Sequence, residues 1–134
     1  MDDQIILTKL PRIVDQRGNL SFFENKAQIP FDIKRVYWIY DVPGGEIRGG
    51  HAYKTLQEVI IALSGSFDVV LNNGKHEERY ALNRSYNALI VPKMIWRHME
   101  NFSTNSLAFI ATNEFYSENE YIRDFDEFKK AKHG

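Results

Sequence analysis

The sequence contains no cysteine among its 134 residues. This absence excludes disulfide bonds, zinc–thiolate sites, iron–sulfur clusters and thiol nucleophiles, because all of them need cysteine sulfur. A metal site would have to be built from the four histidines and the carboxylates. A chain without cysteine also fits a reducing compartment, and we expect a cytoplasmic protein.

Long apolar runs and an excess of charge of one sign are missing as well. No apolar run comes near the roughly 20 residues that a membrane-spanning helix needs, and the acidic first residues do not fit a secretory signal. Lys and Arg number 17 and Asp and Glu number 18, which gives a net charge of -1. We therefore expect neither nucleic acid nor a membrane as a partner.

What the chain does have is enough apolar material for a core, with 43% hydrophobic and 13% aromatic residues. We expect one domain over 1–134. Short β-branched and aromatic runs alternate with turn residues, of which Asn73-Gly74 is the clearest pair. The spacing predicts an all-β sandwich or barrel over about 4–112. The expected strands are 5–9, 20–24, 33–40, 57–63, 66–71, 77–82, 88–91, 96–99 and 107–112.

The C-terminal tail has a different pattern. Ser117 to Glu120 matches a capping box, in which Ser117 is the N-cap and Glu120 reaches back to its amide. Apolar residues then follow at helical spacing, at Tyr121, Ile122, Phe125 and Phe128. This predicts an amphipathic helix over about 118–131, whose aromatic stripe packs against the β domain.

The segment from Gly44 to Lys54 has the densest functional pattern. Its glycines allow a close backbone approach, and Arg48 adds a cation. His51 and Tyr53 are two residues apart, so in a strand both rings face the same side. A histidine that titrates near neutral pH and a phenol that donates a proton can form an acid–base pair. A single histidine is also compatible with an ordinary surface or core position.

The segment resembles the first motif of the cupins, small β-barrels of two packed sheets, in the spacing of Gly45, His51, Tyr53, Glu58 and Gly65. Residues 92–101 resemble the second motif, with Pro92 and Asn101 kept. The resemblance would place metal ligands at His51, Tyr53, Glu58 and Arg97. Arginine has no lone pair to donate, so we expect no bound metal. His98 would replace it only if the strand register slipped by one residue.

Over about 10–130 the chain is similar to the sugar-nucleotide 3,4-ketoisomerases of the cupin superfamily, which act on dTDP-4-keto-6-deoxyglucose and are also described as WxcM-like. The blocks that carry the resemblance are 15–18, 29–37, 48–54, 95–97 and 115–124. It implies a cupin-type jelly-roll barrel of two antiparallel sheets with a C-terminal helix, a homodimer, and no cofactor. The family signature Arg-Gly-x-His-Ala-His-Lys departs here at one position, because Tyr53 replaces the second histidine.

The resemblance also implies roles. His51 would be the base that moves a carbonyl between C4 and C3 of the hexose. Tyr53 would be the acid or the oxyanion donor, and Tyr37 would assist. No Gly-x-Gly-x-x-Gly fingerprint is present, which agrees with a reaction that needs no redox cofactor.

The diphosphate of such a substrate needs cations. Arg48, Arg35 and Arg97 are the candidates, because a guanidinium forks onto phosphate oxygens. Trp96 is a candidate for stacking on the thymine, and the other substrate-binding candidates are Glu58, Lys54 and Arg17. Several of these residues also have an ordinary structural explanation, such as solvation, ion pairing, packing or a position in a turn. Because of Tyr53, a 3,5-epimerase and a non-catalytic sugar-nucleotide-binding or glycan-binding protein remain as alternatives.

Overall fold

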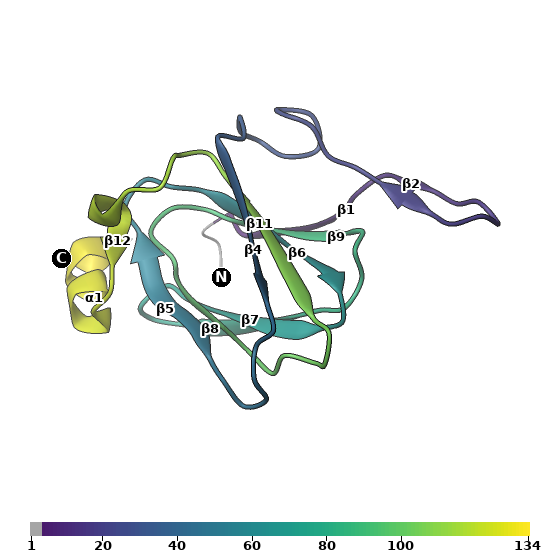
Figure 1. Ribbon diagram of the computed structural model, residues 1–134. Helices are drawn as coiled ribbons and strands as arrows, with labels where there is room; N and C mark the ends of the chain where they lie inside the picture. Colours follow the sequence, from purple (N-terminus) through teal and green to yellow (C-terminus); the bar gives the residue numbers. More distant parts are fainter. Residues whose placement is uncertain (1–3) are drawn as a thin grey trace.

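The computed structural model describes residues 4–134, which form two five-stranded antiparallel sheets and one C-terminal helix (Figure 1). The first sheet has the order β1 (Ile6–Lys9), β9 (Asn87–Val91), β6 (Glu58–Ser64), β11 (Leu107–Thr112) and β4 (Arg35–Tyr40). The second has the order β12 (Tyr121–Ile122), β5 (Arg48–Tyr53), β10 (Trp96–Glu100), β7 (Phe67–Asn72) and β8 (Glu77–Leu82). The predicted all-β fold of two antiparallel sheets is confirmed.

The main core lies between the two sheets. Ile60 and Ala62 of β6 and Ala108 and Ile110 of β11 pack there with Met99 and other apolar residues of the second sheet. Val59 and Ile61 of β6 are also buried, because the segment around Ile29 covers the opposite face of the first sheet. This double burial explains why β6 reads as a continuous apolar run instead of an alternating one.

A third pair of strands forms a hairpin outside both sheets. It consists of β2 (Arg12–Ile13) and β3 (Leu20–Ser21), and it projects from the body at the end away from the helix (Figure 1). Several of its apolar side chains are exposed, namely Ile13, Val14, Leu20 and Phe22. The hairpin therefore leaves apolar surface uncovered in this single chain.

The C-terminal helix begins later than predicted. Helix α1 spans Phe125–His133, and Asp124 caps it by accepting a hydrogen bond from the amide of Glu127 at 3.0 Å. The expected capping box at 117–120 is wrong: it forms a single 3-10 turn (Glu118–Glu120), and Ser117 makes no side-chain cap. The carboxylate of Glu120 instead accepts from the amides of Thr55 and Leu56, both at 2.9 Å. Within residues 4–134, no helix is long and apolar enough to cross a membrane.

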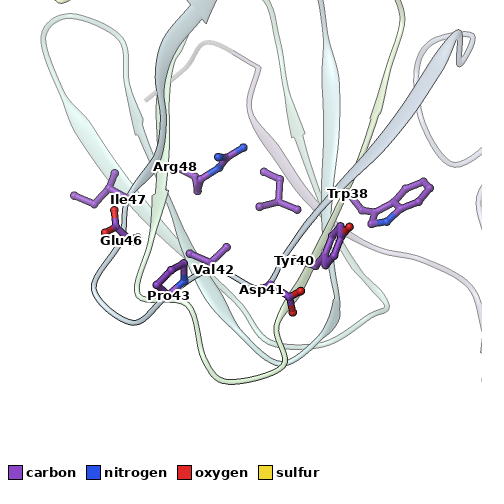
Figure 2. A pocket seen from close by; sticks show the side chains of 9 residues that line it. Trp38, Tyr40, Asp41, Val42, Pro43, Glu46, Ile47 and Arg48 are labelled. Atoms are coloured by element: carbon purple, nitrogen blue, oxygen red, sulfur yellow. The ribbon is translucent and has the colours of Figure 1, made fainter.

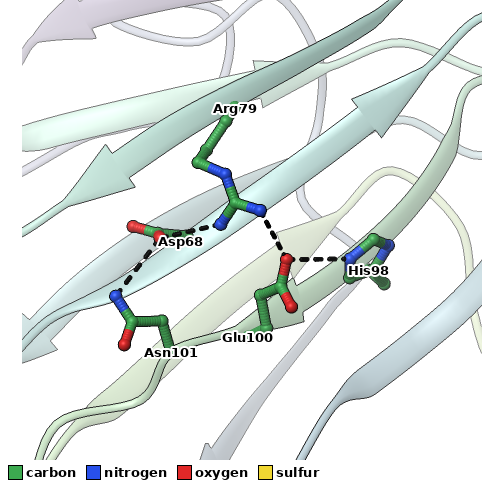
Figure 3. Close-up of polar contacts among 5 residues, drawn as sticks. All are labelled: Asp68, Arg79, His98, Glu100 and Asn101. Atoms are coloured by element: carbon green, nitrogen blue, oxygen red, sulfur yellow. Dashed lines mark hydrogen bonds and ion pairs between the residues drawn. The ribbon is translucent and has the colours of Figure 1, made fainter.

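The outer face of the second sheet is polar where α1 does not cover it. Arg79 donates to Asp68 at 2.9 Å and to Glu100 at 2.7 Å, and Asn101 and His98 extend the network (Figure 3). His98 therefore lies on the solvent side of β10, whereas its neighbours in the strand point inward. It contributes nothing to the interior between the sheets.

Candidate functional site

The candidate site is an open pocket of about 470 Å³ between β4 of the first sheet and the β5–β12 edge of the second. Strand β10 supplies its inner wall. Among the described residues that line the pocket there are four arginines and no Asp or Glu. The arginines are Arg35, Arg48, Arg97 and Arg123. A pocket with this lining attracts anions.

The two rings that the sequence singles out face this pocket together. His51 and Tyr53 alternate with Ala52 along β5, and their ring centroids lie 4.8 Å apart. Tyr121 of β12 pairs with Tyr53 across the strands, and its ring lies 4.9 Å from both of the others in edge contact. The imidazole is thus held between two phenol rings.

His51 has the properties of a neutral base. Its side chain is buried, and its Nε2 has no hydrogen-bond partner among residues 4–134. Burial, followed by the positive charges of Arg97 and Arg123, lowers the pKa of His51 to about 3. The imidazole is therefore uncharged at neutral pH and is free to accept a proton from a ligand in the pocket.

A buried ion pair lies beneath these rings. Arg97 Nε is 2.5 Å from Glu58 Oε1, and Arg97 Nη2 donates to Glu58 Oε2 at 3.1 Å. The side chains of both residues are almost fully buried. Burial is the largest influence and opposes the charged form of Arg97, but the charge and hydrogen bond of Glu58, together with Tyr37 and Tyr53, hold the arginine pKa well above its ordinary value. The guanidinium therefore stays charged and is a fixed cation inside the protein.

The cation is directed at two phenols. Arg97 Nη2 donates to the hydroxyl of Tyr37 at 2.9 Å and to that of Tyr53 at 3.4 Å. Burial raises the pKa of both tyrosines, and the charge of Glu58 adds to the effect. Both phenols therefore keep their protons at neutral pH, and the guanidinium polarises them as hydrogen-bond donors.

The same four residues occupy the positions at which a cupin would hold a metal. His51, Tyr53, Glu58 and Arg97 do converge, but the guanidinium is a cation without a lone pair, and Glu58 is already paired with it. Among the described residues, no three or more His, Asp or Glu lie close enough together to hold a metal ion. This set of donors does not fit a metal site.

Gly49 allows β5 to approach β10 closely at the pocket. Its φ is +99°, and a Cβ would lie 3.0 Å from the Cα of His98 and 3.1 Å from the carbonyl oxygen of Arg97. The register of the two strands shifts between these two residues, as in a β-bulge. Only glycine avoids both the unfavourable φ and the backbone clash.

We expect Gly49→Ala to lower the free energy of unfolding by about 1–3 kcal/mol, because the left-handed backbone would then carry a side chain. Urea unfolding followed by circular dichroism measures the change. Gly44→Ala is the matched control, since a Cβ there meets nothing within 4 Å. Equal stability of the two variants would contradict this explanation of Gly49.

The structure places four predicted substrate-binding residues outside the pocket lining. Trp96 faces the other side of β10 from Arg97 and packs against Phe125 of α1, with ring centroids 5.3 Å apart. Lys54 is exposed beyond the end of β5. Arg17 lies at the tip of the projecting hairpin and pairs with Asp15 at 3.0 Å. Glu58 lies behind Arg97.

A second hollow adjoins the pocket at the turn between β4 and β5 (Figure 2). It has a volume of about 470 Å³ and shares Trp38, Ile39, Ile47 and Arg48 with the arginine-lined pocket. Figure 2 shows Arg48 on the β5 side of this turn and Trp38 on the β4 side. The two hollows together offer room for a ligand longer than a single sugar.

The chain matches the model of the family described as "FdtA: WxcM-like, C-terminal" over residues 3–133. The chain belongs to this family. It is 38% identical over 130 residues to the TDP-4-oxo-6-deoxy-alpha-D-glucose-3,4-oxoisomerase of Aneurinibacillus thermoaerophilus, covering 97% of this chain and 92% of that protein. The predicted membership of the WxcM-like family is confirmed.

Solved structures of 3,4-ketoisomerases agree with this assignment. A histidine-to-asparagine mutant of QdtA from Thermoanaerobacterium thermosaccharolyticum, in complex with TDP-4-keto-6-deoxyglucose, has a TM-score of 0.96 and 34% identity, over 98% of this chain and 96% of that chain. A 3,4-ketoisomerase from Helicobacter canadensis has a TM-score of 0.95 and 40% identity, over 98% of both chains. The similarity between this chain and these 3,4-ketoisomerases therefore covers nearly the whole three-dimensional structure.

Tyr121 and Arg123 line the pocket in this WxcM-like chain, and the sequence analysis did not assign either of them to the site. Tyr121 was placed in the packing stripe of a helix, but it lies in β12 and contacts His51. The two residues are separated by one position, which is the spacing of neighbours on one face of a strand. That spacing within the Tyr-Ile-Arg-Asp block was the available signal.

Proposed function

We propose that this chain is a sugar-nucleotide 3,4-ketoisomerase that acts on TDP-4-keto-6-deoxyglucose in deoxysugar biosynthesis. The observation that carries the proposal is the uncharged imidazole of His51, which belongs to the lining of an arginine-lined pocket and whose Nε2 has no hydrogen-bond partner among the described residues. The named relatives that match nearly the whole chain are 3,4-isomerases, which favours this reaction over 3,5-epimerisation.

The reaction transfers hydrogen as protons. His51 takes the proton from C3, which is acidic because C4 is a ketone, and the C3–H electron pair forms the C3=C4 bond of an enediol. Tyr37 and Tyr53 donate hydrogen bonds to the developing O4 anion, and O4 gains a proton. O3 then loses its proton, C4 is protonated, and the carbonyl stands at C3. The hydrogen leaves and returns as a proton, so these steps need no redox cofactor.

Arg97 supports this chemistry from behind the phenols. Its guanidinium donates to both hydroxyl oxygens, and the two phenols also share a hydrogen bond with each other. An oxyanion in the pocket would accept from both phenols and replace the bond between them. Because Glu58 neutralises the guanidinium, the interior carries no uncompensated charge before the substrate arrives.

The diphosphate would lie at the mouth of the pocket. Arg48 lines both hollows, and Arg35 lies 4.6 Å above the ring of Tyr37. A guanidinium held flat on an aromatic ring keeps its N–H edges free for phosphate oxygens. The sugar then reaches inward to His51, and the nucleoside extends toward the turn between β4 and β5.

We also propose that the protein is a homodimer. The β2–β3 hairpin exposes Val14 by 74% and Ile13 by 57%, and it projects from the body. Exposed apolar side chains on a projecting hairpin favour burial against another surface, and a second copy of the chain offers one. Size-exclusion chromatography with light scattering measures the mass, and a monomer at micromolar concentration would contradict the proposal.

Proton NMR of the protein with TDP-4-keto-6-deoxyglucose in deuterated water tests the function. We expect a 3-keto product that carries deuterium at C4, because the base exchanges its proton with the solvent. Exchange at C3 and C5 without movement of the ketone would indicate a 3,5-epimerase. Binding of TDP without exchange at any carbon would indicate a non-catalytic binding protein.

A further inference from the structure

We propose that Glu118 is a replaceable anion beside the diphosphate subsite: it holds Arg123 at the pocket rim until a phosphate of the ligand takes its place. Neither residue belongs to the acid–base chemistry derived above. The inference rests on the proposed function only in taking a nucleoside diphosphate as the ligand.

The contacts of Glu118 are those that a phosphate group would make. Arg123 donates to Glu118 Oε1 through Nε at 3.1 Å and through Nη2 at 2.8 Å. The hydroxyl of Tyr116 donates to the other carboxylate oxygen. A guanidinium edge and a phenol are the donors that also bind phosphate oxygens, so the same cradle fits either anion.

The pair is placed where it can exchange partners. The Arg123 side chain is 57% exposed and that of Glu118 is 61% exposed, in contrast to 2% and 1% for Arg97 and Glu58. An exposed ion pair contributes little to stability, because water screens it. The ligand can therefore displace Glu118 at little energetic cost, whereas it cannot displace the buried Glu58.

Arg123 is also directed toward the catalytic rings. Its guanidinium lies 4.3 Å above the ring of Tyr121, which in turn lies 4.9 Å from the ring of His51. Arg35 lies 5.0 Å above the ring of Tyr116, so the group that binds Glu118 also touches a second arginine of the pocket. A phosphate at this rim would meet Arg35 and Arg123 together, and the carboxylate of Glu118 would repel it.

A double-mutant cycle on TDP binding, measured by isothermal titration calorimetry, tests the proposal. We expect Glu118→Gln to tighten TDP binding about 3–10-fold, because it removes a competing charge, and Arg123→Gln to weaken it about 10-fold. In the Arg123→Gln background, the gain from Glu118→Gln should fall below twofold. Glu114→Gln is the matched control, since Glu114 belongs to the same segment but pairs with Lys34 and not with an arginine of the pocket.

The cycle separates this proposal from its rivals. If Glu118→Gln weakens TDP binding or leaves it unchanged, then Glu118 does not compete with the ligand and the proposal fails. It also fails if the gain persists without Arg123, or if Glu114→Gln gives the same gain, because either result indicates a general charge effect. If the cycle behaves as expected and the NMR assay shows no turnover, the replacement of Glu118 by a phosphate is supported and the isomerase assignment fails.

Discussion

His51→Asn is expected to lower kcat by about 10²–10⁴-fold, the usual contribution of a positioned general base, while the Kd for TDP changes less than twofold. The imidazole takes the C3 proton, whereas the arginines would hold the diphosphate. The substitution should therefore reduce turnover and leave TDP binding nearly unchanged. Product formation by NMR and TDP titration by calorimetry measure the two quantities on the same samples. Asparagine retains polarity and fits the space, which limits any change in folding.

His76→Asn is the control for this substitution, because His76 lies in an exposed turn and is not among the residues that line the pocket. It should leave kcat and TDP binding unchanged. Turnover by His51→Asn at the native rate would show that another group is the base.

The pH profile of the native protein tests the same residue without mutation. Because burial lowers the pKa of His51 to about 3, the imidazole stays in its basic form as the pH falls through the ordinary histidine range. We expect kcat/KM to stay level from about pH 8 down to about pH 5, and to fall only on approach to the lowered pKa. A decline centred near the unperturbed value of about 6.5 would show an exposed or differently paired histidine.

Breaking the buried ion pair is expected to have the largest effect on stability. Arg97→Met and Glu58→Leu should each lower the free energy of unfolding by about 3–5 kcal/mol, because each leaves an uncompensated charge in the interior. The double variant should be more stable than either single variant, since both charges are then gone. Urea unfolding at neutral pH measures all three.

An exposed pair provides the comparison. Lys26 lies 3.3 Å from Asp32, with side chains 70% and 54% exposed, so Lys26→Met should change the stability by less than about 1 kcal/mol. Additive losses in the double variant of the buried pair would contradict the coupling of Arg97 and Glu58.

The inner half of the site could be predicted from local sequence. Strand alternation places His51 and Tyr53 on one side of β5, and the motif spacing brings Glu58 and Arg97 to the same place. The unsuitability of Arg97 as a metal ligand is also a local property, because the guanidinium has no lone pair to donate. What spacing alone did not give is the ion pair, which depends on how β6 and β10 face each other across the core.

The outer half depends on contacts distant in sequence. Glu120 matches a capping box locally, but its carboxylate satisfies the amides of Thr55 and Leu56, which lie more than sixty positions away. With Glu120 held in this way, the helix begins only at Phe125, and Tyr121 is extended beside β5. The packing of Trp96 against α1 is not visible in the sequence for a related reason, because it depends on α1 covering the outer face of β10.

Strands β4 and β5 follow each other in the chain but belong to different sheets, and residues 41–47 join them. The length of this connection sets how far apart the two walls of the pocket stand at its mouth. The partners of His51 come from β10 and β12, on the other side, and do not depend on it. An insertion or deletion in the connection would therefore resize the entrance for a different sugar or nucleoside while leaving the β10 and β12 partners of His51 in place.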